Sequence, residues 1–189
     1  IVNVSDTELR KLPTPNRLLA AVHAARGQMR GSRKDPRIGR DAFLSVRGEL
    51  LHLMEGSLVF SSTGGGTGNG ITTGILEELT ARPEVPAAEK TSFALLLPYP
   101  RLEPAEYIDN TISFLQGPLS DAIDSGNTGT IYLFSNRLKF ESRMTEAAYN
   151  AALIESLNVF FAIPGKGDSL RLLDGHIDYE DFALFCAKP

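Results

Sequence analysis

The sequence predicts an α/β fold in which helices cover both faces of a parallel sheet, because short apolar strands alternate with helical segments along the chain. The expected strands are residues 1–4, 57–61, 92–97 and 130–134. A chain of 189 residues, 42% of them hydrophobic, is long enough to bury a sizeable core in one domain. We find no internal repeat, low-complexity tract or second domain in the sequence.

A glycine-rich segment follows the second expected strand. Residues 64–70 read Gly-Gly-Gly-Thr-Gly-Asn-Gly, and the helical segment 71–79 places apolar side chains at 71, 75, 76 and 79 on one face. A strand, a glycine loop and the beginning of a helix favour phosphate binding, because bare backbone approaches the anion closely and unpaired N–H groups point at it. The alternative is a flexible linker, which seldom stands between a strand and an amphipathic helix. We therefore interpret this segment as a phosphate-binding loop.

Two common phosphate loops do not fit this segment. A Walker A loop needs Lys directly after its last glycine, where this chain has Ile71. A dinucleotide-binding loop needs Gly-x-Gly-x-x-Gly and an acidic residue at the end of the next strand. Here Glu89 precedes strand 92–97, and Glu103 lies six residues past it. A dinucleotide oxidoreductase stays a remote alternative, with Glu103 as its only ribose-binding candidate.

Two further segments complete the expected order of elements. The turn-forming residues 124–129 introduce strand 130–134. The longest helix is expected over 145–163, ended by Pro164 and Gly165. Its apolar residues include Leu153, Leu157, Phe160 and Phe161. Since they leave little polar surface, we expect this helix to be buried or covered by a neighbour that the chain lacks.

The composition argues against several classes of function. A net charge of −4 argues against non-specific nucleic-acid binding as the main role. The single cysteine, Cys186, rules out an internal disulfide and suits a reducing compartment. His23 and His52 have no partner at metal-ligand spacing. With no apolar run near the ~20 residues that span a bilayer and no visible signal peptide, we expect a cytoplasmic protein without membrane insertion.

The glycine loop resembles the signature of the tubulin/FtsZ superfamily, Gly-Gly-Gly-Thr-Gly-small-Gly, with Asn69 in place of the small residue. The resemblance covers most of the chain. It implies a Rossmann-like three-layer GTP-binding domain over residues 1–189 that ends in a long central helix, here 145–163. Ile1 then corresponds to the family's second strand, so we expect the domain to be incomplete at its amino end and to lack the family's C-terminal second domain.

The resemblance also implies where the phosphates bind. Their contacts are the loop residues Gly64, Gly65, Gly66, Thr67, Gly68, Asn69 and Gly70. Asp6 matches an acidic residue near the phosphates and magnesium, and a helix cap for residues 7–9 is its alternative role. Residues 35–40, at the end of the basic stretch 26–40, resemble the segment that closes over the γ-phosphate, although a solvated basic loop is the alternative for this stretch.

Three residues match the family's nucleoside contacts. Glu103 stands for the ribose-binding acid, and Asn136 stands for an Asn that contacts guanine or ribose, unless it is a plain turn residue. Asn150 occupies the place of the residue that reads the guanine edge. The family stacks an aromatic ring on the base four residues earlier, where this chain has Glu146, and Tyr149 is the available substitute.

The end of the chain resembles the catalytic loop of FtsZ-like proteins. Asp178 and Asp181 match its two acids, and carboxylates three residues apart at a helix start face the same side and polarise one attacking water. Helix capping with a solvated acidic face is the alternative. Family geometry puts this loop at the far end of the central helix, so it completes the neighbour's site and implies a head-to-tail homopolymer.

The resemblance therefore implies a filament-forming GTPase that binds GTP or GDP with Mg²⁺, with no metal held by protein ligands alone. The alternative is a nonhydrolysing scaffold in which the nucleotide gates assembly. Glu146, His176 and Tyr107 stand where the family has other residues, and they would then mark lost catalysis.

Overall fold

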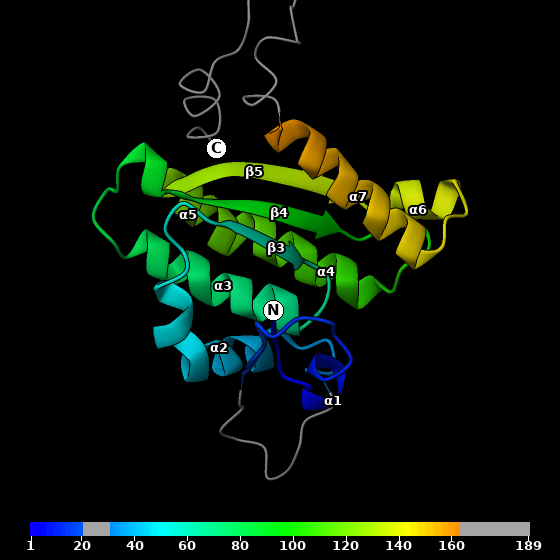
Figure 1. The fold of residues 1–189 in the computed structure, drawn as a ribbon, viewed down its shortest axis with the longest axis horizontal. Coiled ribbons are helices and arrows are strands. Elements are labelled where there is room, and N and C mark those ends of the chain that lie inside the picture. The colour runs from blue at the N-terminus through cyan, green and yellow to red at the C-terminus, as the bar shows by residue number, and fades with distance from the viewer. Residues whose placement is uncertain (21–30, 163–189) are drawn as a thin grey trace, which may run out of the picture.

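The structure is a computed structural model that describes residues 1–20 and 31–162. Its elements, in chain order, are β1 (Val2–Asn3), α1 (Asp6–Leu9), β2 (Leu18–Leu19), α2 (Pro36–Leu51), β3 (Leu58–Ser62), α3 (Thr67–Thr80), η1 (Ala87–Glu89), β4 (Thr91–Leu97), α4 (Ala105–Phe114), η2 (Leu115–Leu119), α5 (Ser120–Asp124), β5 (Thr128–Ser135), α6 (Arg137–Glu141) and α7 (Glu146–Phe161). Figure 1 shows how these elements are arranged.

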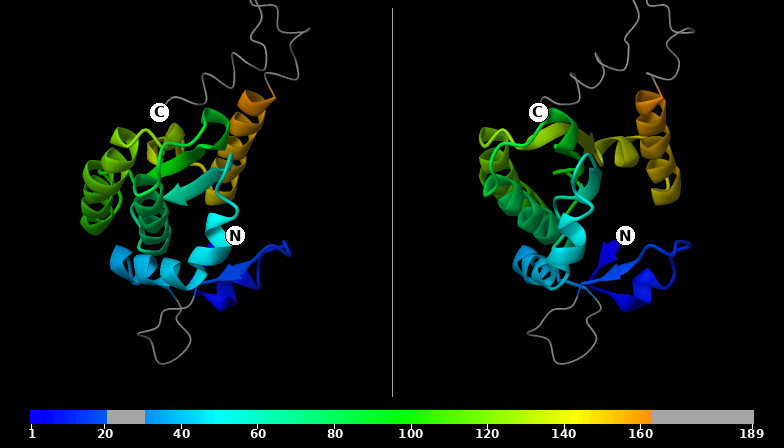
Figure 2. Two further views of the ribbon diagram at one scale, coloured as in Figure 1. Left: turned by 90° about the vertical axis from the view of Figure 1, so that its left-hand side faces the viewer. Right: turned by 60° about the vertical axis from the view of Figure 1, so that its left-hand side comes forward.

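The strands form two parallel groups rather than one continuous sheet. β1 pairs with β2, and β3, β4 and β5 pair in that order, with Val59 opposite Phe93 and Phe93 opposite Ile131. Figure 2 shows α3 and α4 on one side of the larger group and α7 on the other. The predicted α/β fold with a parallel sheet and helices on both faces is therefore confirmed, but among the described residues the sheet is interrupted between β1 and β3.

The core lies between the inner face of this sheet and helices α2 and α3. Phe93 and Leu95 of β4 are completely buried against Leu76 of α3, and Phe43 of α2 packs on the other side of α3. Burial of each such side chain contributes about 1.5–3 kcal/mol. Helices α2 and α3 are also linked by ion pairs at the surface. In one of them the Arg47 guanidinium lies 2.6 Å from the Glu78 carboxylate and lowers its pKa.

Several helix ends differ from the expectation. α3 begins at Thr67 rather than 71, because the last glycines form its first turn. Within the basic stretch 26–40, a helix begins at Pro36 and the Asp35 side chain accepts a hydrogen bond from the Arg37 N–H, so this part is not a loop. Ser5, not Asp6, caps α1, which makes the capping role of Asp6 wrong.

Helix α7 agrees with its predicted range but is buried on one face only. Thr145 caps it by accepting a hydrogen bond from the Ala148 N–H. Leu153 and Leu157 are buried as expected, whereas Phe161 is 41% exposed. No helix in the described ranges is both long and apolar enough to cross a bilayer.

Asn127, in the turn before β5, holds the carboxyl end of α3. Its buried amide donates to the carbonyls of Leu79 and Arg82 at 3.0 and 2.9 Å and accepts from the Val85 N–H at 3.1 Å. The substitution Asn127→Ala leaves these three groups without their partner. We expect it to lower the free energy of unfolding by about 2 kcal/mol, measured by urea denaturation. Unchanged stability would show that water replaces the carboxamide.

Candidate functional site

A cavity with a volume of about 310 Å³ opens where β3, β4 and β5 end. Its lining residues come from the glycine loop, from the segments after β4 and β5, and from α7: Ser62, Gly64, Gly65, Leu96, Pro98, Glu103, Tyr107, Asn136, Lys139, Glu146, Tyr149 and Asn150. The carboxyl edge of a parallel sheet is the usual place for a ligand in α/β folds. The cavity is therefore the candidate functional site.

Five of the residues predicted to bind the nucleotide lie together in this cavity: Gly64, Gly65, Glu103, Asn136 and Asn150. Others do not line it: Asp6, Gly66, Thr67, Gly68, Asn69 and Gly70. Thr67 and Gly68 border a second cavity instead. The predicted catalytic residues Asp178 and Asp181 lie outside the described residues, as do His23, His176 and Cys186.

The glycine loop is held in place by buried amide and hydroxyl groups. The Asn69 side chain donates to the Thr63 carbonyl at 2.5 Å and to the Asn110 carbonyl at 3.2 Å. Asn110 in turn donates to the Gly64 carbonyl at 3.0 Å. Asn69 is only 3% exposed, so its side chain fixes the loop instead of reaching the cavity. Asn110 was missed by the sequence interpretation, since nothing in sequence links it to a loop 46 residues away.

The glycines of the loop serve two different purposes. A Cβ on Gly66 would overlap the Ser32 hydroxyl and the Asp35 backbone, and one on Gly70 would overlap the Pro36 carbonyl. These glycines therefore allow the amino end of α2 to pack directly on α3. A Cβ on Gly65, by contrast, would lie 3.6 Å from its nearest neighbour, the Ser62 Oγ. Gly65 keeps its backbone bare toward the cavity, and the amino end of α3 has no side-chain cap.

Glu103 and Asn136 form one polar cluster in the lining of the cavity. The Asn136 amide donates to both carboxylate oxygens of Glu103 at 3.1 and 3.0 Å, and the Tyr99 N–H donates to Oε2 at 2.6 Å. A carboxylate has about four acceptor positions, so one stays available for a ligand hydroxyl. The predicted ribose contact and the predicted Asn contact are thus brought together from segments 33 residues apart.

Helices α6 and α7 supply the far wall. Tyr149 is buried and its hydroxyl donates to the Ser135 carbonyl at 2.7 Å. Burial, with the nearby negative charge of Glu103 as a second cause, raises the pKa of Tyr149, so its ring stays neutral. Lys139 lies 3.6 Å from the Glu146 carboxylate. Lys139 was not predicted, because the short helix α6 was not recognised.

In the described part of the basic stretch, residues 31–40, two arginines form ion pairs. Arg37 bonds to Asp35 at 2.8 Å, and this hydrogen bond lowers the pKa of the Asp35 carboxyl. Arg40 bonds to Glu77 on α3 at 2.8 Å. These two guanidinium groups hold the beginning of α2, and neither lines the cavity.

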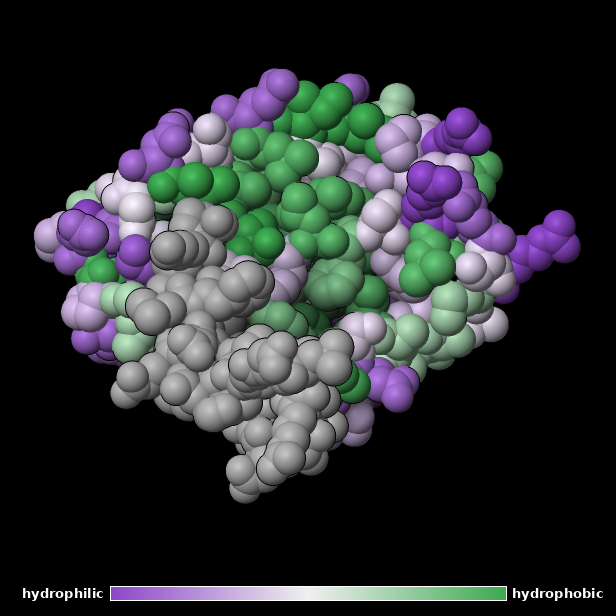
Figure 3. Space-filling model, turned by 90° about the horizontal axis from the view of Figure 1, so that it is seen from above, coloured by the Kyte–Doolittle hydropathy of each residue, from purple (hydrophilic) through white to green (hydrophobic). Residues whose placement is uncertain are grey.

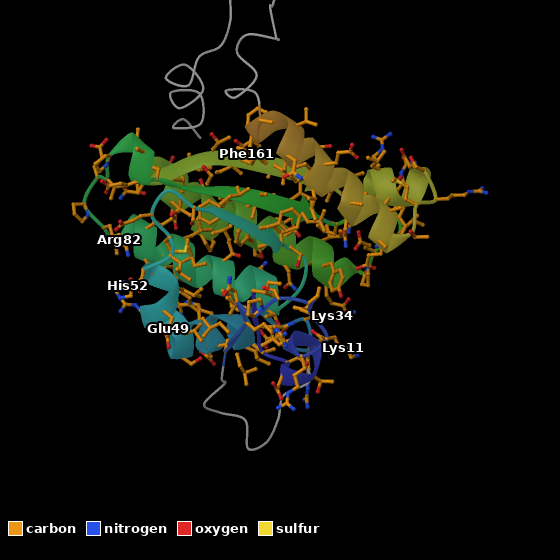
Figure 4. The ribbon with its side chains drawn as sticks, viewed as in Figure 1. Lys11, Lys34, Glu49, His52, Arg82 and Phe161 are labelled. Atoms are coloured by element: carbon orange, nitrogen blue, oxygen red, sulfur yellow. The ribbon has the colours of Figure 1, made fainter. Side chains whose placement is uncertain are left out.

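Lys34 differs from these arginines because it lies beside the amino end of α4 (Figure 4). Its ammonium is 5.0 Å from the centre of the Tyr107 ring and 4.0 Å from the Glu106 carboxylate. Its carbonyl accepts from the same Asn110 amide that holds Gly64. Lys34, among the described residues of the basic stretch, is therefore linked to the glycine loop, through its backbone carbonyl and Asn110.

The described residues do not by themselves build a metal centre. None of their His, Cys, Asp and Glu side chains form a group of three or more arranged to hold an ion. The Asp6 carboxylate, expected near magnesium, bonds to Arg10 at 2.7 Å. Magnesium needs only one or two protein carboxylates when phosphate oxygens complete its shell, so this donor set fits an ion carried by a nucleotide.

No protein-family model matches the sequence, and no curated protein matches it. Solved structures do match. CetZ2 from Haloferax volcanii, in a GTPγS-bound protofilament, is similar with a TM-score of 0.67 and 20% identity over 91% of this chain and 50% of that one. CetZ1 from the same organism, a GDP-bound monomer, has a TM-score of 0.60 and 19% identity over 83% of this chain and 47% of that one.

CetZ from Methanosaeta thermophila gives a TM-score of 0.56 and 19% identity over 90% of this chain and 46% of that one. The chain thus spans about half the length of these structures. They are members of the tubulin/FtsZ family. At such low sequence identity, the similarity concerns the arrangement of helices and strands. This arrangement includes the parallel strands and the glycine loop between β3 and α3. The chain therefore has a tubulin/FtsZ-like fold.

Proposed function

We propose that this chain is the nucleotide-binding part of a filament-forming GTPase, with residues 1–189 as the GTP-binding domain. The observation that supports this proposal best is the cavity that joins Gly64 and Gly65 to Glu103, Asn136 and Asn150. A bare loop before an uncapped helix suits phosphates, and a carboxylate with an amide beside it suits a ribose. The same arrangement fits GDP.

In this proposal the phosphates lie beside Gly64 and Gly65, the loop residues that line the cavity, at the amino end of α3. Backbone N–H groups and the helix dipole stabilise their charge, and the Lys34 ammonium approaches them from its place beside the amino end of α4. The ribose hydroxyls bond to Glu103, while Asn136 keeps this carboxylate oriented. The base lies toward α7, where the Tyr149 ring and the Asn150 amide meet it and favour guanine.

Mg²⁺ would arrive on the phosphates, with Asp6 as the protein carboxylate that the family resemblance assigns to it, once Arg10 releases this side chain. The ion would supply charge neutralisation between the phosphate oxygens. The residues of this chain bind and orient the nucleotide, and they exclude water from its buried side.

We propose further that subunits assemble head to tail in the cytoplasm and that Asp178 and Asp181 act on the nucleotide of the next subunit. One of the similar structures is a GTPγS-bound protofilament, which supports self-association as a working hypothesis. Each carboxylate would orient an attacking water toward the γ-phosphate. The competing proposal, a nonhydrolysing scaffold, is favoured by Glu146, which lines the cavity where the family has a stacking ring.

GTP turnover over a series of protein concentrations, with sedimentation measured in parallel, tests this proposal. We expect turnover per subunit to rise steeply above a threshold concentration at which polymer sediments, because each site needs two subunits. Polymer without phosphate release would support the scaffold instead. If GTP neither binds nor promotes sedimentation, both proposals are wrong and only the fold remains.

The substitution Glu103→Gln tests the ribose contact. A hydrogen bond to a charged group contributes about 1.5–3 kcal/mol, so we expect the affinity for GTP to fall by roughly ten-fold or more. Isothermal titration calorimetry measures this change. Glu84→Gln is the matched control, since Glu84 is exposed and does not line the cavity. Equal affinities for the two variants would contradict the assignment of Glu103.

A further inference from the structure

A lysine lines the candidate cavity, and the phosphate and ribose contacts proposed above do not use it. Among the lining residues that the structure describes, Lys139 is the only lysine or arginine, and Glu103 and Glu146 are the only acids. Lys34, the cation proposed to approach the phosphates, does not line this cavity. The Lys139 ammonium therefore has a place in the cavity without a role in those contacts.

The position of Lys139 follows from the beginning of α6. Asn136 is the N-cap of this helix, and its amide holds the proposed ribose acid, Glu103. Residues three apart on a helix lie on one face, so Lys139 follows Asn136 on the same face, about 4.5 Å further along the axis. Both residues line the cavity. Lys139 therefore lies one helical turn beyond the ribose contact.

A tight turn brings Lys139 against the first turn of α7. The Lys139 carbonyl accepts a hydrogen bond from the Met144 N–H at 2.9 Å, and the Phe140 carbonyl accepts one from the Arg143 N–H at 3.2 Å. With Arg143 at a φ of 50°, these two bonds form the Schellman turn that ends α6. α7 begins at Glu146, whose carboxylate lies 3.6 Å from the Lys139 ammonium. The ammonium is thus on the α7 side of the cavity.

The Lys139 side chain is more buried than the other charged side chains of α6. Figure 3 shows strongly hydrophilic residues at the α6 end of the molecule, beside an apolar area over the middle of this face. Arg137 is 66% exposed and pairs with Glu141, whereas Lys139 is only 23% exposed. Its partner Glu146 is 76% exposed, and exposed ion pairs contribute little to stability. The ion pair alone therefore does not explain a lysine in the cavity.

Helix α7 presents its own polar groups to the same part of the cavity. Glu146 and Asn150 are four residues apart, so they share one face of the helix, and both line the cavity. In the proposed function the base lies toward this helix and Asn150 meets it. An ammonium that is one turn beyond the ribose contact and beside Glu146 therefore faces the base rather than the phosphates.

Guanine has an edge that such an ammonium recognises. Its O6 and N7 atoms are neighbouring acceptors, and a Lys or Arg that donates to this pair is the commonest specific contact to guanine in nucleic-acid recognition. Adenine keeps N7 but has an N6–H₂ donor in place of O6, and this donor repels an ammonium. The Asn150 carboxamide offers a donor and an acceptor, which suits the opposite edge, where guanine has its N1–H and 2-amino groups.

We infer that Lys139 selects guanine by donating hydrogen bonds from its ammonium to O6 and N7 of the base. Glu146 is a positioning residue, which pairs with the ammonium and keeps it on the α7 side of the cavity. The two edges of the base are then recognised from two helices, by Lys139 of α6 and by Asn150 of α7. This inference rests on the proposed function and adds to it the residue that distinguishes GTP from ATP.

Isothermal titration calorimetry with GTP, 7-deaza-GTP and ITP tests this inference. 7-Deaza-GTP has a C–H group in place of N7, and ITP lacks the 2-amino group. We expect the parent to bind 7-deaza-GTP about ten-fold more weakly than GTP, because one hydrogen bond to a charged group is lost. In the Lys139→Met variant this preference should disappear, while the preference for GTP over ITP stays. Lys139→Arg should keep both preferences, since a guanidinium also donates to O6 and N7.

Two further variants complete the experiment. Lys11→Met is the matched control, because Lys11 is exposed and lies near α1, outside the cavity lining (Figure 4). It should bind all three nucleotides as the parent does. Glu146→Gln removes the charge that holds the ammonium, so the preference for GTP over 7-deaza-GTP should become smaller without disappearing. An unchanged preference in this variant would contradict the positioning role of Glu146.

The outcomes separate this inference from the proposed function. If the parent binds GTP and 7-deaza-GTP equally, or if Lys139→Met keeps the parent's preference, the inference is wrong while the proposed function stands. An equal loss of affinity for all three nucleotides in Lys139→Met would assign Lys139 to the phosphates or to the packing of α6 on α7, and it also overturns the inference. If the parent does not bind GTP at all, the proposed function itself is wrong, and the inference with it.

Discussion

Gly70→Ala is expected to lower the free energy of unfolding by about 3 kcal/mol or more. Its Cβ would overlap the carbonyl oxygen of Pro36 and approach the backbone of Gly39 and Arg40. Overpacking typically costs about 1–3 kcal/mol and sometimes more, and here the obstacles are backbone atoms of a helix that cannot turn away. The better helix propensity of alanine returns only about 1 kcal/mol. α2 would have to move away from α3, and urea denaturation measures the loss.

Gly65→Ala is the matched control for this prediction. The added methyl group meets nothing closer than the Ser62 Oγ at 3.6 Å, so we expect stability close to that of the parent. Because Gly65 lines the candidate cavity, GTP affinity should fall in this variant although the fold is intact. If the Gly70→Ala variant were as stable as the Gly65→Ala variant, the prediction that α2 packs too closely on α3 to admit a methyl group at position 70 would be wrong.

Asp178→Ala is expected to reduce GTP turnover by about 100-fold or more, within the contribution typical of general acid–base catalysis. Asp178 and Asp181 lie outside the described residues, and their role rests on the resemblance of the segment 176–182 to a catalytic loop. The proposed site places these acids in the neighbouring subunit. GTP affinity and sedimentation should therefore stay close to those of the parent while phosphate release falls.

Glu180→Ala is the control, because it removes an acid from the same segment that has no assigned role. A mixture of subunits adds a sharper test. Asp178→Ala subunits carry intact nucleotide sites, so parent subunits added in excess should restore hydrolysis at those sites. Equal loss of turnover in the Glu180→Ala variant, or no loss in the Asp178→Ala variant, would contradict the catalytic role proposed for Asp178.

Individual strands and helices could be predicted from the sequence because the residue patterns that form them act between near neighbours. The strand 92–97 and the helix 145–163 agree closely with β4 and α7, since apolar period, turn residues and a helix-ending proline act over short distances. The helix at Pro36 was missed although Asp35 and Pro36 are a strong start signal. The basic charges around them were interpreted as a segment over the γ-phosphate, with a solvated loop as the alternative, and neither interpretation included a helix.

The chemical kinds of residue at the site, a bare glycine loop, a carboxylate and an amide, could be recognised from the order of residues alone. Which of these groups meet in space depended on the folded chain. Folding brings Glu103 within 3.1 Å of Asn136, buries Asn69 inside the loop and leaves a cleft between β1 and β3. The physical reason is range: backbone propensity and periodicity act between near neighbours, whereas strand pairing and close packing join segments tens of residues apart, with their geometry set by the whole core.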